Sequence, residues 1–214
     1  MITLGHLSHP EAMRYMGGAG IEPDERMSAM LSECEALVLQ TARPKFLYRI
    51  AELPDEELAA GNDIKAHLSG CDKAAVLCAT LGADVDKLIR VTQVSDMARA
   101  VTLNSFANVA VEQLCDKAEQ EIAAQYPDRY MTFRYSPGYG DYPLSLQKTL
   151  LTFLDAPRKI GLSANENHLL IPSKSVTAVA GLSLYPIEQK RQGCAVCQLR
   201  GDCSYRRNGG HCGF

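Results

Sequence analysis

The sequence predicts an α+β protein in which one twisted sheet, mixed or antiparallel, is flanked by helices. Most segments before residue 125 show the apolar spacing of amphipathic helices. After residue 130, short runs of alternating or β-branched residues are typical of strands, so we expect most strands there. With 46% hydrophobic residues among 214, the chain is able to bury a substantial core.

Two helices are expected first. His9-Pro10-Glu11 begins a short helix that Gly17-Gly18 ends, because proline suits a first turn and glycine often follows a last one. A second helix begins near Pro23-Asp24-Glu25 and ends before Pro44. Its apolar residues recur at helical spacing: Met27, Met30, Leu31, Cys34, Leu37 and Val38.

The middle of the chain predicts two strands and then two helices. Residues 46–51 alternate as in a half-buried strand, and residues 74–79 form a continuous apolar run typical of a buried strand. The pattern from Asp84 to about Gln125 is helical, with a break at the capping pair Ser95-Asp96. The second of these helices has a partly polar face formed by Val101, Ser105, Asn108 and Glu112.

The last elements of the main domain are three strands and a helix. Residues 131–135 alternate and lead, as a strand, into the turn at residues 136–140. Residues 145–154 predict a helix. Two further strands are expected around residues 169–171 and 175–184, the second of them rich in valine, threonine and small residues.

Composition excludes several classes of function. The formal net charge of −3 argues against a nucleic-acid-binding protein, which needs a basic face. No apolar stretch reaches the roughly 18 residues of a membrane span. Residues 1–6 lack the basic and apolar regions of a secretory signal, so we expect a cytoplasmic protein.

Composition changes after Pro186, which divides the chain into a main domain, residues 1–186, and a Cys-rich metal-binding tail, residues 187–214. Four of the eight cysteines lie in the last 21 residues, whereas the other four are scattered among apolar neighbours and are expected to be buried. The thiolates of the four tail cysteines suit a zinc site or an iron–sulfur cluster, and the alternative is a tail of reduced cysteines without metal. The spacing is Cys-x2-Cys-x5-Cys-x8-Cys, at Cys194, Cys197, Cys203 and Cys212.

The segment from Arg134 to Gly140 is the first candidate ligand site. An arginine at the end of a strand is suited to clamp a carboxylate through two parallel hydrogen bonds. Pro137-Gly138 forms a turn whose backbone has room to approach a ligand, and Tyr139 offers an aromatic plane with a hydroxyl group. The alternative interpretation, an ordinary turn beside a surface arginine, has equal weight on local sequence alone.

Glu166 is the second candidate. It lies between two asparagines just before an apolar strand, where a carboxylate is able to receive an ammonium or sulfonium group. Taken alone, the segment favours an exposed glutamate in a polar turn. We interpret His168 and Lys174 as ordinary polar residues of a loop.

These segments together resemble the activation (reactivation) domain of cobalamin-dependent methionine synthase. The resemblance covers roughly residues 30–185, and its Arg-x-x-Pro-Gly-Tyr element is the most specific part. The helix that carries Glu112 also looks like the corresponding helix of that family. The matching segments, in order, are residues 81–85, 134–139, 160–162 and 166–176.

The resemblance implies that the chain binds S-adenosylmethionine and supports reductive methylation of oxidised cobalamin, with one electron from a separate donor. Arg134 would then hold the substrate carboxylate, and the backbone of Pro137-Gly138 would line the ligand. Tyr139 would face both ligand and corrin as the catalytic residue. Glu166 would contact the methionine moiety or its sulfonium side, so that Arg134 and Glu166 converge on one ligand.

Two departures from the family matter. Residues 164–167 read Ala-Asn-Glu-Asn where the family often has Leu-Thr-Glu-Ser, which puts the hydroxyl contacts of that loop in doubt. No cobalamin-binding motif of the Asp-x-His-x-x-Gly type is present. We therefore expect the corrinoid on a partner, either a methionine synthase without its own activation domain or another corrinoid methyltransferase.

Two alternative functions remain. A non-catalytic, metal-binding accessory would dock on a corrinoid protein without using S-adenosylmethionine. A conventional S-adenosylmethionine methyltransferase ranks lower, because Gly17-Gly18-Ala19-Gly20 follows a helix-like segment instead of an early strand. An iron–sulfur cluster on the tail would relay an electron, which zinc does not do.

Overall fold

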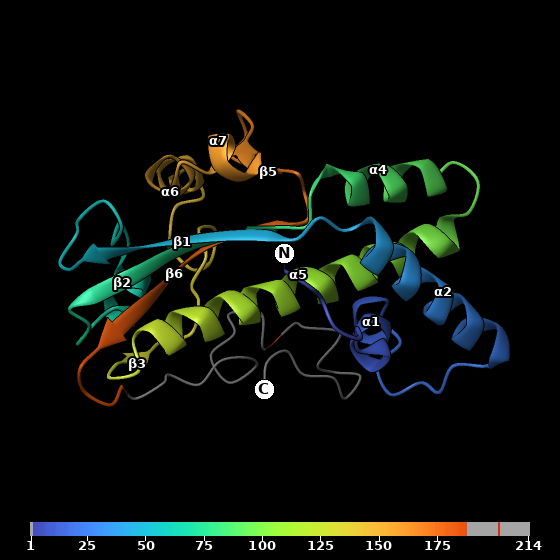
Figure 1. The fold of residues 1–214 in the computed structure, drawn as a ribbon, viewed down its shortest axis with the longest axis horizontal. Helices are drawn as coiled ribbons and strands as arrows, with labels where there is room; N and C mark the ends of the chain where they lie inside the picture. Colours follow the sequence, from blue (N-terminus) through green and yellow to red (C-terminus); the bar gives the residue numbers. More distant parts are fainter. Residues whose placement is uncertain (1, 188–200, 202–214) are drawn as a thin grey trace.

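A four-stranded antiparallel sheet lies at the centre of the structure (Figure 1). The structure is a computed structural model that describes residues 2–187 and residue 201. The strand order is β1-β2-β6-β3, and every neighbouring pair is antiparallel, so of the two predicted sheet types the antiparallel one is present. The strands are β1 (Lys45–Glu52), β2 (Lys73–Thr80), β3 (Tyr130–Met131) and β6 (Ser175–Ser183).

Helices cover both faces of this sheet. The long helix α5 packs under β1 and β2, and both α1 and α2 pack against α5 (Figure 1). On the opposite face lie α6, α7 and a small two-stranded ribbon formed by β4 and β5. The remaining bounds are α1 (His9–Tyr15), α2 (Glu25–Thr41), α3 (Asn62–His67), α4 (Ala83–Thr92), α5 (Met97–Gln125), α6 (Leu146–Leu154), α7 (Ala156–Ile160), β4 (Ser163–Ala164) and β5 (Leu170–Ile171).

Strand β2 is buried along almost its whole length because both of its faces are covered. Val76 belongs to the core cluster that contains α6, and the next residue, Leu77, belongs to the cluster that contains Ile122 of α5. This alternation explains why the sequence shows a continuous apolar run here instead of a polar–apolar pattern.

The predicted helix starts are confirmed by their caps. The Asp24 carboxylate accepts a hydrogen bond from the Met27 N–H at 2.7 Å, and the Asp96 carboxylate accepts one from Arg99 at 2.9 Å. Each cap satisfies a backbone donor that a first helical turn leaves unpaired. The break between α4 and α5 therefore falls at the predicted Ser95-Asp96 pair.

The strand predicted over residues 131–135 is shorter than expected. β3 ends at Met131, and pairing resumes only in an isolated bridge between Tyr135 and Val179. Between them, the Thr132 hydroxyl accepts the Gly181 N–H at 2.8 Å, where a regular strand would use a backbone carbonyl. The backbone therefore leaves the regular ladder before it reaches Arg134.

Three short elements were not predicted, whereas the distribution of strands along the chain was. α3, α7 and β4 are absent from the sequence-based assignment; in α7, Pro157 lies in the first turn, where proline is compatible with a helix. Four of the six described strands, β3 to β6, lie from residue 130 onward, as predicted, although two of the three long strands, β1 and β2, precede residue 81.

The predicted burial of the scattered cysteines is confirmed for Cys34, Cys78 and Cys115, whereas Cys71 is half-buried. Burial raises the pKa of both Cys78 and Cys115 to about 12. Within residues 2–187 and 201, no helix combines the length and apolar character that crossing a bilayer requires.

Candidate functional site

Arg134 lies beside three carboxylates of helix α5. Its Nη1 is 2.8 Å from Asp116 Oδ1 and 3.0 Å from Glu119 Oε2, and its Nη2 is 2.5 Å from Glu112 Oε2. The three acidic residues follow one another at steps of four and three, which places them on one face of the helix. We call Arg134, Glu112, Asp116 and Glu119 the Arg134 cluster.

The Arg134 cluster carries more acidic than basic groups. Burial acts to lower the pKa of Arg134, but the Glu119 and Glu112 carboxylates outweigh it and hold this pKa above its usual range. Burial raises the pKa of Glu119, and Arg134 only partly offsets this effect. The second oxygen of Glu119, Oε1, is buried and accepts no hydrogen bond from any described residue. A cationic group of a ligand would donate the hydrogen bond that this oxygen lacks.

The predicted turn follows directly after Arg134. Pro137 is buried, and Gly138, at φ 96°, donates its N–H to the Tyr142 carbonyl at 2.8 Å. A Cβ atom on Gly138 would lie 3.2 Å from a methyl group of Leu144. Both the backbone angle and the limited space therefore favour glycine at this position of the predicted turn.

A mutual pair of aspartates fixes the far end of this turn. The Asp141 carboxylate accepts the N–H groups of Asn62 and Asp63, at 2.7 and 2.9 Å, at the start of α3. The Asp63 carboxylate in turn accepts the Asp141 N–H at 3.1 Å. These backbone hydrogen bonds, led by the one from Asp63, lower the pKa of Asp141, so its carboxylate is ionised at neutral pH.

Tyr139 projects from the turn into solvent, with 65% of its surface exposed. Its ring centroid lies 6.2 Å from that of Tyr135, which itself lies 6.1 Å from the buried ring of Tyr142. Tyr139 is thus the exposed end of an aromatic group whose other members are packed in the core. The exposed part of its ring is available to a planar partner.

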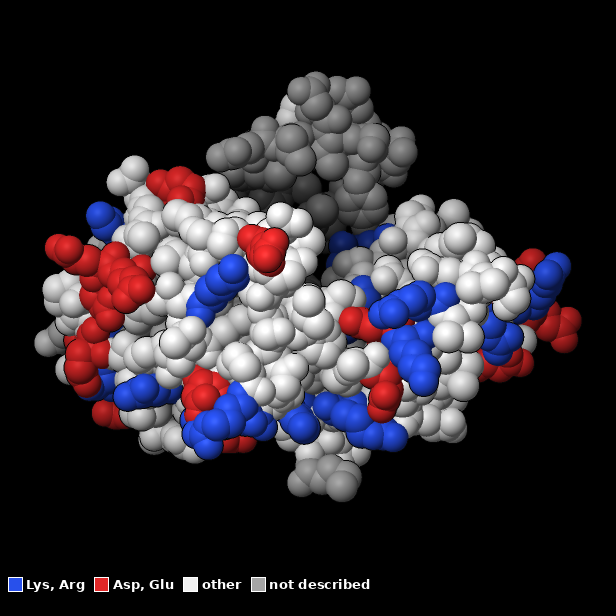
Figure 2. Space-filling model, turned by 90° about the horizontal axis from the view of Figure 1, so that it is seen from above, with Lys and Arg blue, Asp and Glu red and all other residues white. Residues whose placement is uncertain are grey.

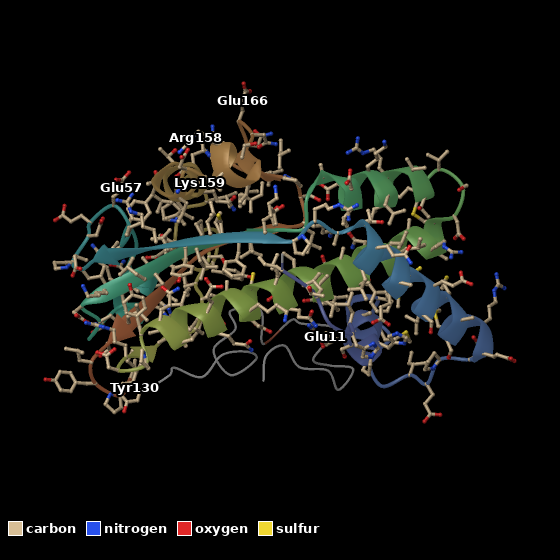
Figure 3. All side chains as sticks on the ribbon, in the orientation of Figure 1. Glu11, Glu57, Tyr130, Arg158, Lys159 and Glu166 are labelled. Atoms are coloured by element: carbon tan, nitrogen blue, oxygen red, sulfur yellow. The ribbon has the colours of Figure 1, made fainter. Side chains whose placement is uncertain are left out.

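Glu166 lies elsewhere. It occupies the turn between β4 and β5, where the Asn165 side chain accepts the Leu169 N–H at 2.9 Å, and its own side chain is exposed. Figure 3 shows Glu166 at the outer rim beyond α7, on the face of the sheet opposite to α5. Arg134 contacts α5, so the sheet separates the two residues. The expected convergence of Arg134 and Glu166 on one ligand is not met.

The face that carries α6 and α7 has a mixed charge distribution. Figure 2 shows Lys and Arg side chains interspersed with Asp and Glu on this face, with acidic groups gathered at one end. Arg158 and Lys159 of α7 project there near Glu166, and Arg158 pairs with Asp155 (Figure 3). Glu166 is therefore one of the exposed charged residues of this face.

Sequence reasoning missed a second polar contact on α5. Lys174, interpreted as an ordinary loop residue, donates from Nζ to the side-chain oxygens of Asn104 and Asn108 at 2.7 and 2.8 Å. Burial lowers the pKa of this lysine. The available signal was the spacing of the two asparagines, which lie four and eight residues before Glu112. Together they form the α5 polar stripe: Asn104, Asn108, Glu112, Asp116 and Glu119.

The predicted metal ligands Cys194, Cys197, Cys203 and Cys212 lie outside the described residues. The division at residue 186 likewise falls at the edge of the described part of the chain. The metal assignment and the division into a main domain and a tail therefore stay predictions.

Neither a comparison with family models nor one with curated proteins finds a match. Among solved structures, the crystal structure of the MetH reactivation domain bound to AdoHcy is similar, with a TM-score of 0.66 and 14% sequence identity. The similarity covers 96% of this chain and 82% of that one. The chain therefore has the fold of the methionine synthase reactivation domain, as its sequence motifs predict.

Proposed function

We propose that this chain binds S-adenosylmethionine and supports the reductive methylation of a corrinoid held by a separate protein. The observation that carries this proposal is the similarity, over 96% of the chain, to a reactivation domain bound to AdoHcy. AdoHcy is what remains of S-adenosylmethionine after its methyl group has been transferred. The partner would be a methionine synthase or another corrinoid methyltransferase.

The Arg134 cluster is the proposed binding site for the amino-acid end of the ligand. S-adenosylmethionine carries an ammonium, a sulfonium and a carboxylate group. The excess of carboxylates in the cluster favours binding of the ammonium and sulfonium groups. The buried Oε1 of Glu119, which has no hydrogen-bond partner among the described residues, is a suitable acceptor for the ammonium group. The described contacts of Arg134 use only its Nη atoms, so its Nε–H is the donor we assign to the ligand carboxylate.

This assignment removes Glu166 from the ligand site that the sequence resemblance implies. Glu166 is exposed on the other face of the sheet, and the acidic contacts to the ligand are better supplied by Glu112 and Glu119. Pro137 and Gly138 keep their proposed role of lining the ligand with backbone. Tyr139, with its exposed ring, is proposed to lie between ligand and corrin.

The protein would contribute position more than chemistry. S-adenosylmethionine supplies the methyl group, whose bond to sulfur breaks as a bond to reduced cobalt forms, and a separate donor supplies the electron. The cluster would hold the amino-acid end of the ligand, and the backbone of the turn at residues 137–138 would line it. Orientation of this kind lowers the barrier by avoiding the entropy loss of a chance encounter.

Isothermal titration calorimetry with S-adenosylmethionine and with AdoHcy tests the proposal directly. We expect one binding site on the unaltered chain. Methylation of a cob(II)alamin-loaded partner in the presence of a chemical reductant would then test the reaction itself. Absence of binding would favour the alternative, an accessory protein that docks on a corrinoid protein without using the ligand.

Anaerobic purification followed by iron and zinc analysis tests the proposal for the tail cysteines. An iron–sulfur cluster would give visible absorption and support electron relay near the corrinoid. A colourless protein with one zinc ion would exclude relay, because zinc has no redox chemistry.

A further inference from the structure

His6, His9 and Glu35, none of which belongs to the Arg134 cluster, converge near the start of the chain. His6 Nδ1 lies 2.7 Å from Glu35 Oε1, and His9 Nε2 lies 2.8 Å from Glu35 Oε2. The two ring nitrogens and the one carboxylate oxygen offered as ligands all lie within 4.8 Å of one another. We infer that these three residues bind a divalent first-row transition-metal ion of the zinc type.

The donor set suits such an ion. Two imidazole nitrogens and one carboxylate oxygen, with a fourth position open to water, form a standard set of zinc ligands. Ligand atoms at about 2.0–2.1 Å from a tetrahedral ion lie roughly 3.3 Å apart. The present nitrogen–oxygen distances are shorter by about half an ångström, so a small outward rotation of the rings opens the site.

The surrounding structure holds the ligands in place before any ion arrives. The Leu7 N–H donates to Glu35 Oε1 at 2.7 Å, and Leu7 itself is fully buried. The Gln113 side chain accepts the Gly5 N–H at 2.8 Å and donates to the His6 carbonyl at 3.2 Å. Support of this kind around metal ligands fixes their orientation and strengthens metal binding.

The site also has a path for entry. The side chain of Glu35 is 12% exposed and that of His9 28%, whereas that of His6 is 75% exposed. An ion therefore reaches His6 from solvent and then the two inner ligands. On binding, the contact of each ring nitrogen with Glu35 is exchanged for a bond to the metal, and any proton on that nitrogen leaves through water. Bound metal would clamp residues 5–9 to helix α2.

The tail cysteines are also predicted metal ligands, so the test must separate the two sites. We would replace Cys194, Cys197, Cys203 and Cys212 with serine in the full chain and titrate this protein with Co²⁺ and Zn²⁺. We expect one equivalent of Co²⁺ with visible d–d bands and no thiolate-to-metal charge transfer. In the same background, His6→Ala, His9→Ala and Glu35→Gln should each lower the affinity by at least about tenfold.

Controls keep the test specific. Glu33→Gln changes a carboxylate two residues away on α2 that pairs with Arg99, and it should leave metal affinity unchanged. Glu35→Gln keeps an oxygen that accepts the Leu7 N–H, and circular dichroism checks that each variant folds. Zn²⁺ should raise the melting temperature of the serine background and leave that of its His9→Ala variant unchanged.

Two results would overturn the inference. One is a serine-substituted chain that takes up no Co²⁺. The other is a folded His9→Ala variant that binds Co²⁺ as tightly as its parent. Neither result bears on S-adenosylmethionine binding, which calorimetry measures in metal-free buffer.

Discussion

Arg134 and Glu119 form a salt bridge in which one carboxylate oxygen lies 3.0 Å from Nη1 while the other is buried without a hydrogen bond from any described residue. One oxygen of the Glu119 carboxylate is therefore paired within the protein, and the other is available to another hydrogen-bond donor. The arrangement makes Glu119 costly to ionise in the absence of a ligand.

The first prediction concerns the pH dependence that Glu119 introduces. Burial raises the pKa of Glu119 above its ordinary value of 4.5, so the folded state holds this proton more tightly than the unfolded state. The stabilising contribution is complete below that ordinary pKa and is lost as the pH rises through the folded pKa. Relative to Glu119→Gln, the unaltered chain should become less stable from about pH 4 upward. Urea denaturation of both proteins across this range measures the difference, and a constant difference would contradict it.

The second prediction concerns ligand binding by Arg134. Arg134→Ala should weaken S-adenosylmethionine binding by about 1.5–3 kcal/mol, the contribution of a hydrogen bond to a charged group. Arg129→Ala is the matched control, because Arg129 also pairs with a carboxylate, that of Asp72, but outside the cluster. Calorimetry should find normal affinity for the control. Equal affinities in both folded variants would remove Arg134 from the site.

The third prediction concerns the turn that presents Tyr139. A Cβ atom on Gly140 would overlap the Asp63 carboxylate and lie 2.7 Å from the Tyr135 hydroxyl, at a φ of 53°. Gly20 has a φ of 75° with no atom within 4 Å of a Cβ, so it isolates the backbone strain. Gly20→Ala should cost about 1–2 kcal/mol of unfolding free energy, and Gly140→Ala distinctly more. Chemical denaturation measures both, and equal costs would show that the Asp63 contact is unimportant.

The fourth prediction concerns Lys174. Asn108→Ala removes one of the two side-chain oxygens that the lysine ammonium contacts and should destabilise the fold by about 1–2 kcal/mol. Asn167→Ala, in an exposed turn, serves as the control and should be nearly neutral. Thermal and urea denaturation measure both variants. A neutral Asn108→Ala would mean that water replaces the lost acceptor without cost.

The sequence predicts those parts of the fold that local chemistry determines. Capping residues such as Asp24 and Asp96 act on amides three residues away, so their effect is visible in the sequence itself. The apolar run of β2 and the helical spacing of α2 likewise report burial directly. These features correctly predicted α2, β2, the start of α5 and the fold class.

The site is less predictable because distant segments build it. Arg134 meets carboxylates 15 to 22 residues earlier in the chain, and local sequence shows the arginine without its partners. Glu166 has the residue type expected of a ligand contact, but the sheet separates it from Arg134. The buried contact of Lys174 was missed for the same reason, since its asparagine partners lie about 70 residues away in the chain.

The helical phase of α5 also fixes how its contacts with Lys174 and with Arg134 are oriented relative to each other. Asn108 and Glu112 are one turn apart, so Lys174 and Arg134 are served by the same side of one rigid rod. Deleting a single residue between them would rotate one half of the rod by about 100° against the other and turn one set of partners away. Inserting four residues there instead would nearly preserve the phase of the two halves, but it would move the partners of Lys174 and of Arg134 apart by about 6 Å. The length of this short stretch is therefore as constrained as the identity of the residues that flank it.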